Sequence, residues 1–102
     1  MATLEQLTER VKTAVGDDSG LGKSLKFDLR GQGFVHIAGG DVSNDDLPAD
    51  LILSISIADL QALGEGRLDP MTAVMSGRLG MSDMGLAMAL QPKMQALFAR
   101  IA

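Results

Sequence analysis

The sequence predicts an α+β domain in which helices pack on one face of a small sheet. In residues 25–30 and 51–57, apolar side chains alternate with polar ones, which is the period of strands with one buried face. In residues 3–15 and 58–101, apolar side chains instead recur every three or four positions, as they do along one side of a helix. Strand patterns thus concentrate in the first half and helix patterns in the second, which is typical of helices layered on one sheet face. The length of 102 residues suits a single domain over residues 1–102.

Turn and cap residues divide the chain into individual elements. Thr3 begins a capping box at the start of the first helix. Ser56 is suited to cap the second helix, and Asp69 followed by Pro70 begins the third. Pro92 is expected to open the last helix. The predicted elements are a helix at 3–15, strands at 25–30, 34–38, 41–43 and 51–57, helices from 58 to 64 or 66 and from 70 to 76, a strand at 78–81, and helices at 83–90 and 92–101.

Composition and charge exclude several classes of function. A net charge of −4, with nine Lys and Arg, no Trp and no Tyr, leaves neither a basic face nor stacking side chains for nucleic acid. Without Cys, the chain has no disulfides, thiolate metal sites or thiol catalysis. The longest uncharged runs, 51–58 and 84–92, are about half of the ~20 residues that a membrane-spanning helix needs. Because Glu5 and Glu9 interrupt the apolar stretch that a signal peptide requires, a cytoplasmic location is expected.

The segment from Gly16 to Ser24 resembles a phosphate-binding loop but lacks two of its requirements. The first glycine of such a loop stands five positions before the Gly-Lys-Ser, and here that position holds Asp17. The segment also follows a predicted helix and precedes a predicted strand, the reverse of the order that directs a helix N-terminus at the phosphate. A flexible connecting loop is therefore the preferred interpretation.

The other polar side chains on predicted strands and turns are not expected to form a metal or catalytic site. Acidic residues from Asp41 to Asp50 supply some calcium-loop donors, but Ile52 stands where a bidentate Glu is needed, so a solvated turn is favoured. His36 has no second strong zinc ligand and is expected to lie half-buried in its strand. Lys26 is expected to face water. No catalytic residue, metal or cofactor is therefore predicted, and the protein is not expected to be an enzyme.

Apolar side chains exceed what a helix that only covers a sheet requires. From Met84 to Leu90 nothing charged appears over two helical turns, whereas such a helix normally keeps a polar face. Gly85 and Ala89 share the side that is expected to face outward, so that Met84, Ala87 and Met88 face the sheet. Each apolar side chain fits an ordinary core, but three flexible apolar helices over one sheet also describe the wall of a lipid-sized pocket. The predicted ligand-binding residues are Phe27, Phe34, Leu53, Ile55, Met71, Val74, Met75, Met84, Met88, Leu97, Phe98 and Ile101.

Several stretches of the sequence match those of a known domain. They are Pro48 to Asp50, Ile57 to Leu60, Gly66 to Pro70, Ala73 to Leu79 and Asp83 to Met88. With these residues the chain resembles the sterol carrier protein 2 (SCP-2) domain. The resemblance covers most of 25–90 and implies a mixed five-stranded sheet of order 3-2-1-4-5, with helices over one face and an apolar tunnel between them.

The resemblance also implies a function, because members of the family bind sterols, fatty acids, acyl-CoA or other lipids without transforming them. Two departures are Val74, where the family usually has Phe, and a chain about one residue short before Asp83, which predicts a shortened or bulged last strand. The predicted function is non-catalytic binding or carrying of a fatty acyl, isoprenoid or sterol-like ligand in an internal cavity. The alternative is an accessory module whose Met-rich helices dock on a protein partner, for instance in a lipid or isoprenoid-quinone biosynthesis complex.

Overall fold

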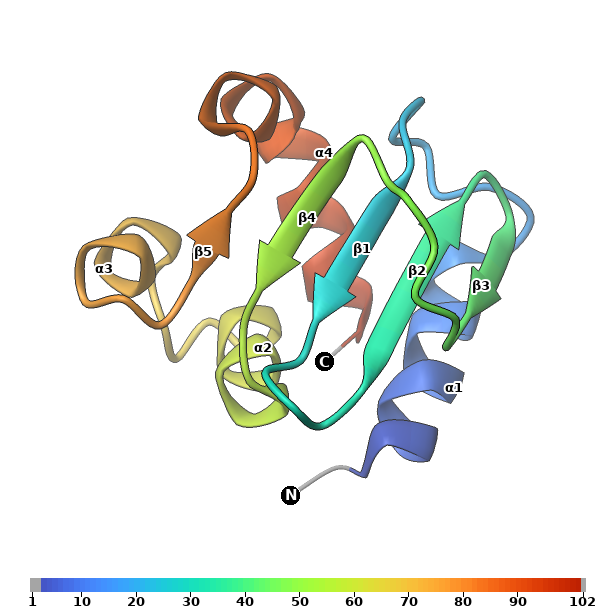
Figure 1. Ribbon diagram of the computed structural model, residues 1–102, viewed down its shortest axis with the longest axis horizontal. Helices are drawn as coiled ribbons and strands as arrows, with labels where there is room; N and C mark the ends of the chain where they lie inside the picture. Colours follow the sequence, from blue (N-terminus) through green and yellow to red (C-terminus); the bar gives the residue numbers. More distant parts are fainter. Residues whose placement is uncertain (1–2, 102) are drawn as a thin grey trace.

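The computed structural model describes residues 3–101, whose strands form one mixed sheet with helices behind it (Figure 1). The strand order is β3-β2-β1-β4-β5, which confirms the order that the resemblance implies. Helix α1 lies behind β2 and β3, and α4 runs behind β1 and β4 (Figure 1). The elements are α1 (Leu4–Val15), β1 (Leu25–Asp28), β2 (Phe34–Ala38), β3 (Asp41–Ser43), β4 (Leu51–Ser54), α2 (Ile57–Gly64), α3 (Pro70–Met75), β5 (Gly80–Met81) and α4 (Met84–Ile101).

The topology follows from how β1 pairs with its two neighbours. β1 is antiparallel to β2, with Leu25 opposite Ile37, and parallel to β4, with Leu25 opposite Leu51. A parallel neighbour cannot be reached by a tight hairpin, so the chain must cross the sheet before β4. The β3–β4 connection makes this crossing in front of the sheet, on the face opposite the helices (Figure 1).

The alternation of side chains along the strands places one sheet face against the helices, as the sequence predicts. Leu25, Phe27 and Leu29 are fully buried on that face. Their pairing partners Leu51 and Leu53 in β4 are buried beside them. Removal of this apolar surface from water is the main stabilising term of the fold.

Cap residues fix the helix starts close to the predicted positions. Thr3 and Gln6 form the capping box, since each side chain accepts a hydrogen bond from the backbone of the other, at 3.2 and 3.0 Å. Ser56 and Asp69 cap α2 and α3 by accepting a bond from the backbone three residues on. Pro70 occupies the first turn of α3, where its missing N–H leaves no partner unsatisfied.

The last helix differs from the prediction, because α4 continues through Pro92. The sequence predicted separate helices at 83–90 and 92–101, since proline favours the first turn of a helix. This prediction is wrong because one buried stripe crosses the proline, with Leu90 before it and Met94 after it both buried. Burying several large apolar side chains, at about 1.5–3 kcal/mol each, outweighs the ~3 kcal/mol that an internal proline costs. The ribbon of α4 bends along its length in Figure 1, and bends in helices commonly arise at proline.

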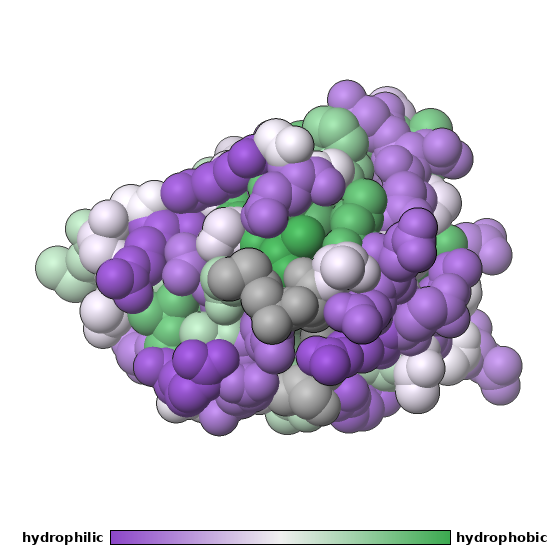
Figure 2. All heavy atoms as spheres, turned by 90° about the horizontal axis from the view of Figure 1, so that it is seen from below, coloured by the Kyte–Doolittle hydropathy of each residue, from purple (hydrophilic) through white to green (hydrophobic). Residues whose placement is uncertain are grey.

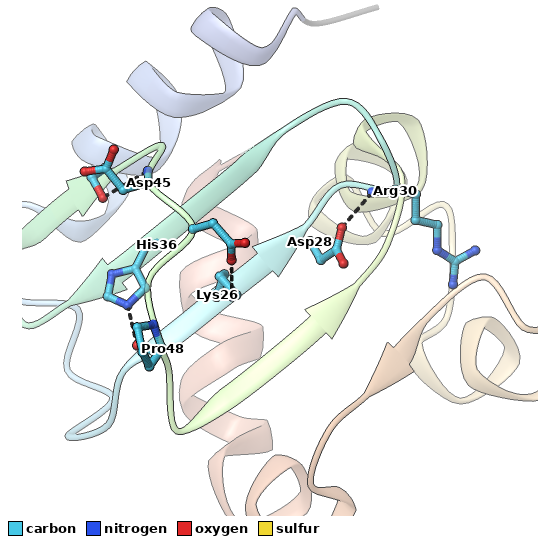
Figure 3. A network of polar contacts seen from close by, with 8 residues as sticks. Lys26, Asp28, Arg30, His36, Asp45 and Pro48 are labelled. Carbon is cyan, nitrogen blue, oxygen red and sulfur yellow. Dashed lines mark hydrogen bonds and ion pairs between the residues drawn. The ribbon is translucent and has the colours of Figure 1, made fainter.

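The sheet face opposite the helices is partly covered by the β3–β4 connection (Figure 3). Lys26, which was expected to face water, is only 8 % exposed. Its ammonium pairs with the Asp46 carboxylate and lies 5.4 Å from the centroid of the Phe34 ring. His36 Nε2 donates a 3.0 Å hydrogen bond to the carbonyl oxygen of Pro48. The expectation for Lys26 is therefore wrong, because alternation along one strand gives no information on a distant segment that covers it.

Three strands are shorter than predicted. β1 ends at Asp28 rather than at residue 30. β4 ends at Ser54 rather than at residue 57, because Ser56 already caps α2. β5 holds only Gly80 and Met81, so the predicted shortening of the last strand is confirmed.

Candidate functional site

An apolar pocket of about 110 Å³ lies between α3, the β4–β5 edge of the sheet and α4. Most of its lining is hydrocarbon or thioether, and the polar side chains in it are those of Gln91 and Gln95. This space is therefore suited to apolar contacts rather than to polar chemistry. Five of the seven methionines of the chain line it: Met71, Met81, Met84, Met88 and Met94.

Helix α3 forms one wall of the pocket and buries little apolar surface. Of its six residues Ala73 is buried, whereas Met71 is 66 % and Met75 is 82 % exposed. Met71 and Val74 line the pocket. Because its contact with the core comes from Ala73 and the partly buried Val74, α3 is a thin wall of the pocket.

Arg30 ties the end of α3 to the end of β4. Its guanidinium donates to the Ser54 carbonyl at 3.2 Å and to the Gly77 carbonyl at 2.9 Å. The backbone of Arg30 has a φ of 54°, which is uncommon for a residue other than glycine and which belongs to the turn between β1 and β2. Polar contacts of this side chain thus hold α3 beside the pocket.

The edge of the sheet forms the floor of the pocket. Leu53 lies opposite Met81 in the antiparallel β4–β5 pair, and both residues line the space. Leu79, just before β5, is buried and lines it as well. β5, which has only two residues, is the last strand of the sheet. The edge of the sheet therefore lies beside the pocket.

Helix α4 forms the opposite wall. Ala87 is buried in this wall, whereas Met84 and Met88, which also line the pocket, are 50 % and 67 % exposed. Gly85 and Ala89 are exposed, in agreement with the prediction that they share the outer side of the helix. The prediction that Met84 and Met88 face the sheet is wrong, because only Ala87, of the three residues placed on that side, is buried. Met84 and Met88 therefore contact the pocket without being covered, and the pocket opens to solvent at its methionines.

A second hollow, of about 350 Å³, adjoins the first. Pro70, Gln95 and Phe98 line both spaces. Its other walls come from the end of α2 and from the segment between α2 and α3, and they include Asp69. Figure 2 shows the molecule from below, which is the side on which α2 lies in Figure 1. This surface is mostly hydrophilic, with a patch of hydrophobic atoms open within it. The apolar pocket thus has a more polar neighbour on the other side of Phe98.

The structure brings half of the predicted ligand-binding residues together at the apolar pocket. They come from the sheet edge, from α3 and from both halves of α4. Their role in binding stays a prediction. These residues are Leu53, Met71, Val74, Met84, Met88 and Phe98.

The other predicted ligand-binding residues lie elsewhere. Phe27, Ile55 and Leu97 are fully buried in the core. Phe34 lies on the sheet face opposite the helices, beneath Lys26. Met75 is exposed on α3 and does not line the pocket. The side chain of Ile101 lies outside the part of the chain that the structure describes.

Sequence reasoning missed several lining residues, and for those of α4 beside and beyond Pro92 the missing signal was the continuity of the helix. Met84 and Met88 continue at helical spacing to Gln91 and Gln95 only when the helix runs through Pro92. Predicting two helices broke this series. The lining residues that were not predicted are Pro70, Leu79, Met81, Ala87, Gln91, Met94 and Gln95.

Acidic side chains of the β3–β4 connection are engaged with neighbouring residues. Asp46 pairs with Lys26, and the Asp50 carboxylate accepts bonds from the Ser24 backbone N–H at 3.0 Å and from its hydroxyl at 3.1 Å. These bonds, the backbone one first, hold the pKa of Asp50 below its ordinary value. Within residues 3–101 no group of three or more His, Asp or Glu side chains is placed to hold a metal ion. None of the helices in this range is long and apolar enough to cross a bilayer.

The fold and the pocket define a class of protein, namely α+β domains with helices on one face of a five-stranded sheet and an apolar pocket beside the last helix. The sequence model of the SCP-2 sterol transfer family matches residues 2–95. The chain belongs to this family. No curated protein matched the sequence.

Solved structures share this fold. Sterol carrier protein 2 like 2 (SCP2-L2) from Aedes aegypti is 17 % identical, with a TM-score of 0.71 over 90 % of this chain and 93 % of that chain. Palmitated SCP2L2 from Aedes aegypti is 17 % identical, with a TM-score of 0.62 over 93 % and 95 % of the two chains. The ubiquinone synthesis protein UbiJ-SCP2 is 17 % identical, with a TM-score of 0.57 over 90 % and 77 %.

Proposed function

We propose that this protein binds a long apolar molecule, such as a fatty acyl chain, an isoprenoid or a sterol-like lipid, in the pocket between α3, β5 and α4. The observation that carries the proposal is the gathering of five methionines around one pocket that is open to solvent. Methionine side chains are unbranched and polarisable, so they adapt to apolar partners of variable shape. Large methionines half or more exposed on two neighbouring helices also lack the cover that an ordinary core would give them.

The size of the pocket bears on how a ligand enters. At about 110 Å³ the space is smaller than the ~300–1,000 Å³ of typical ligand sites. A rigid empty site of that larger size would lower the free energy of unfolding by about 7–24 kcal/mol. This cost is as large as or larger than the ~5–15 kcal/mol stability of a whole domain. The ligand-free pocket is therefore expected to be partly collapsed, with methionine side chains and α3 moving aside when a ligand binds.

The chemistry of the lining supports binding without catalysis. Among the described residues that line the two adjoining hollows, the one that titrates is Asp69. Its carboxylate already accepts a 3.1 Å bond from the Thr72 backbone as the cap of α3. General acid–base chemistry needs a positioned donor or acceptor beside the reacting group, and this lining offers no pair of such groups. Membership of the SCP-2 family and the palmitated state of the Aedes aegypti relative support the same proposal.

A thermal-shift panel tests the proposal. A ligand present at a hundred times its Kd stabilises a protein by roughly 2.7 kcal/mol, which raises the Tm of a domain this size by about 10 °C or more. We expect such shifts with long-chain alcohols, esters and isoprenoids and none with short polar compounds. A broad lipid panel that leaves the Tm unchanged would contradict the proposal.

One observation favours a second candidate function, an accessory module that docks on a protein. Met75 is the most exposed large apolar side chain in the described chain, and it lies on α3 outside the pocket lining. UbiJ-SCP2, a protein of ubiquinone synthesis, shares the fold. Native mass spectrometry of the protein purified from its host separates the candidates, since a co-purifying lipid supports the first and a stoichiometric protein partner supports the second.

A further inference from the structure

Two glutamines give the apolar pocket its polar side chains. Gln91 and Gln95 lie one turn apart on α4, and both line the pocket. Both residues are exposed, and neither makes a side-chain hydrogen bond to another described residue. A carboxamide is uncharged and offers both donors and an acceptor. These groups are therefore suited to a hydroxyl or carbonyl at the end of an apolar ligand.

Among the residues that the structure describes, none that lines either hollow carries a positive charge. The one charged residue in this described lining, Asp69, is acidic. Arg67 stands in the sequence between Gly66 and Leu68, which line the second hollow. Its Nε donates a 2.6 Å hydrogen bond to the Glu65 carboxylate. Bonds from Gln61 and from Arg67 lower the pKa of Glu65, which keeps this pair charged and joined. Lys93 lies between the two glutamines in sequence but lines neither hollow.

The position of Gln95 indicates where a polar end would lie. Gln95 lines both hollows, together with Pro70 and Phe98. An apolar chain lying among the methionines would thus reach the more polar hollow beside this amide. An ionised carboxylate or phosphate at the same point would meet no cation among the described lining residues and would lie near the acidic side chain of Asp69.

We propose that the ligand is uncharged at its polar end, and that Gln95, with Gln91 one turn away, binds that end. The ligand class is an apolar chain or ring system that carries a hydroxyl, ester or carbonyl group. Fatty acid anions, acyl-CoA and phospholipids are selected against. This inference rests on the proposed function of the pocket, and it adds the chemistry of the ligand's polar end.

Two ligands of equal chain length and different charge provide the test. Dodecanol and dodecanoate are titrated separately into the protein at pH 8, dodecanol below its solubility limit and dodecanoate below its micellar concentration, with binding followed by calorimetry. We expect dodecanol to bind at least about tenfold more tightly, because only dodecanoate brings an unpaired charge. Equal or tighter binding of dodecanoate overturns the uncharged end and leaves the pocket itself supported. If neither compound binds, the proposed function fails and this inference fails with it.

A charge placed at Gln95 makes the position of the polar end testable. Gln95→Lys supplies a cation at the junction of the hollows, so the affinity for dodecanoate should rise at least about tenfold. Ala96→Lys is the matched control, since it adds the same charge at the next position, which is exposed and lines neither hollow. We expect it to leave the ratio of the two affinities unchanged. Equal effects of the two variants would overturn the placement of the polar end at Gln95.

Discussion

The rings of Phe27 in β1 and Phe98 in α4 lie with their centroids 5.9 Å apart and their planes tilted by 48°. Phe27 is fully buried, whereas Phe98 also lines both hollows. This pair therefore marks the boundary between the closed core and the open apolar space. Tilted aromatic pairs contribute about 0.5–1.5 kcal/mol beyond the area that they bury, so Phe98 couples the stability of the domain to the shape of the pocket.

Replacing Phe98 by leucine tests this coupling. Phe98→Leu keeps an apolar side chain and loses the ring pair, so we expect the free energy of unfolding to fall by about 1–2 kcal/mol in a urea titration. The affinity for a long-chain ligand should change as well, since Phe98 lines the pocket. Phe34→Leu is the control, because that ring lies on the opposite sheet face and should not affect the ligand. Equal changes of affinity in both variants would contradict the role given to Phe98.

The sequence was sufficient to predict the parts of the fold that depend on local signals. Caps at Thr3, Ser56 and Asp69 depend on bonds over three residues, and the alternation in β1 depends on a fixed period of two. Pro92 gives a local signal too, but a buried stripe on both sides of it decides the structure of α4. The polar side chains of the pocket were missed for this reason, since Gln91 and Gln95 join the series of Met84 only along one continuous helix.

Contacts between distant segments could not be predicted from the sequence. Lys26 and Asp46 are twenty residues apart, and their pairing depends on how the β3–β4 connection crosses the sheet. Arg30 reaches the Gly77 carbonyl over forty-seven residues, which no periodicity reveals. The same limit applies to the pocket, because the pairing of Leu53 with Met81 brings its floor together.

Replacing Pro92 by alanine should stabilise the ligand-free protein. Proline in a helix interior is about 3 kcal/mol less favourable than alanine, and part of this difference should be recovered, so we expect a gain of about 1–3 kcal/mol in thermal or urea unfolding. Lining residues lie on both sides of Pro92, Met84 before it and Phe98 after it, so the variant should also change ligand affinity. A destabilised Pro92→Ala protein would show instead that the packing of α4 requires the bend.

Stability in acid should depend on Asp50. Because bonds from Ser24 hold its pKa below the ordinary value, the folded state favours the ionised carboxylate. This contribution is complete above the unfolded-state pKa of about 4, and it is lost as the pH falls through the lower folded-state pKa. Asp50→Asn should therefore be less stable than the wild type near pH 7, and the difference should shrink as the pH falls below about 4. Urea titrations across this range measure it, with Asp45→Asn in the same connection as the control. A difference that stays constant with pH would contradict the assignment.

Two alanines on α4 allow the same atoms to be added inside and outside the pocket. Ala87 is buried and lines the pocket, whereas Ala89 is exposed and does not line it. In Ala87→Leu the added carbons have a space of about 110 Å³ beside them. We therefore expect the ligand-free variant to stay within about 1 kcal/mol of the wild type in urea unfolding, because a side chain that fills open space creates no overpacking.

The effect on binding distinguishes a pocket from a core. A leucine at position 87 occupies volume that a ligand needs, so we expect the affinity for a long-chain alcohol to fall at least about tenfold. Ala89→Leu should leave both stability and affinity unchanged. If the space were instead a filled part of the core, Ala87→Leu would overpack it and cost roughly 1–3 kcal/mol. Such destabilisation, together with unchanged ligand affinity, would mean that any ligand binds elsewhere on the protein.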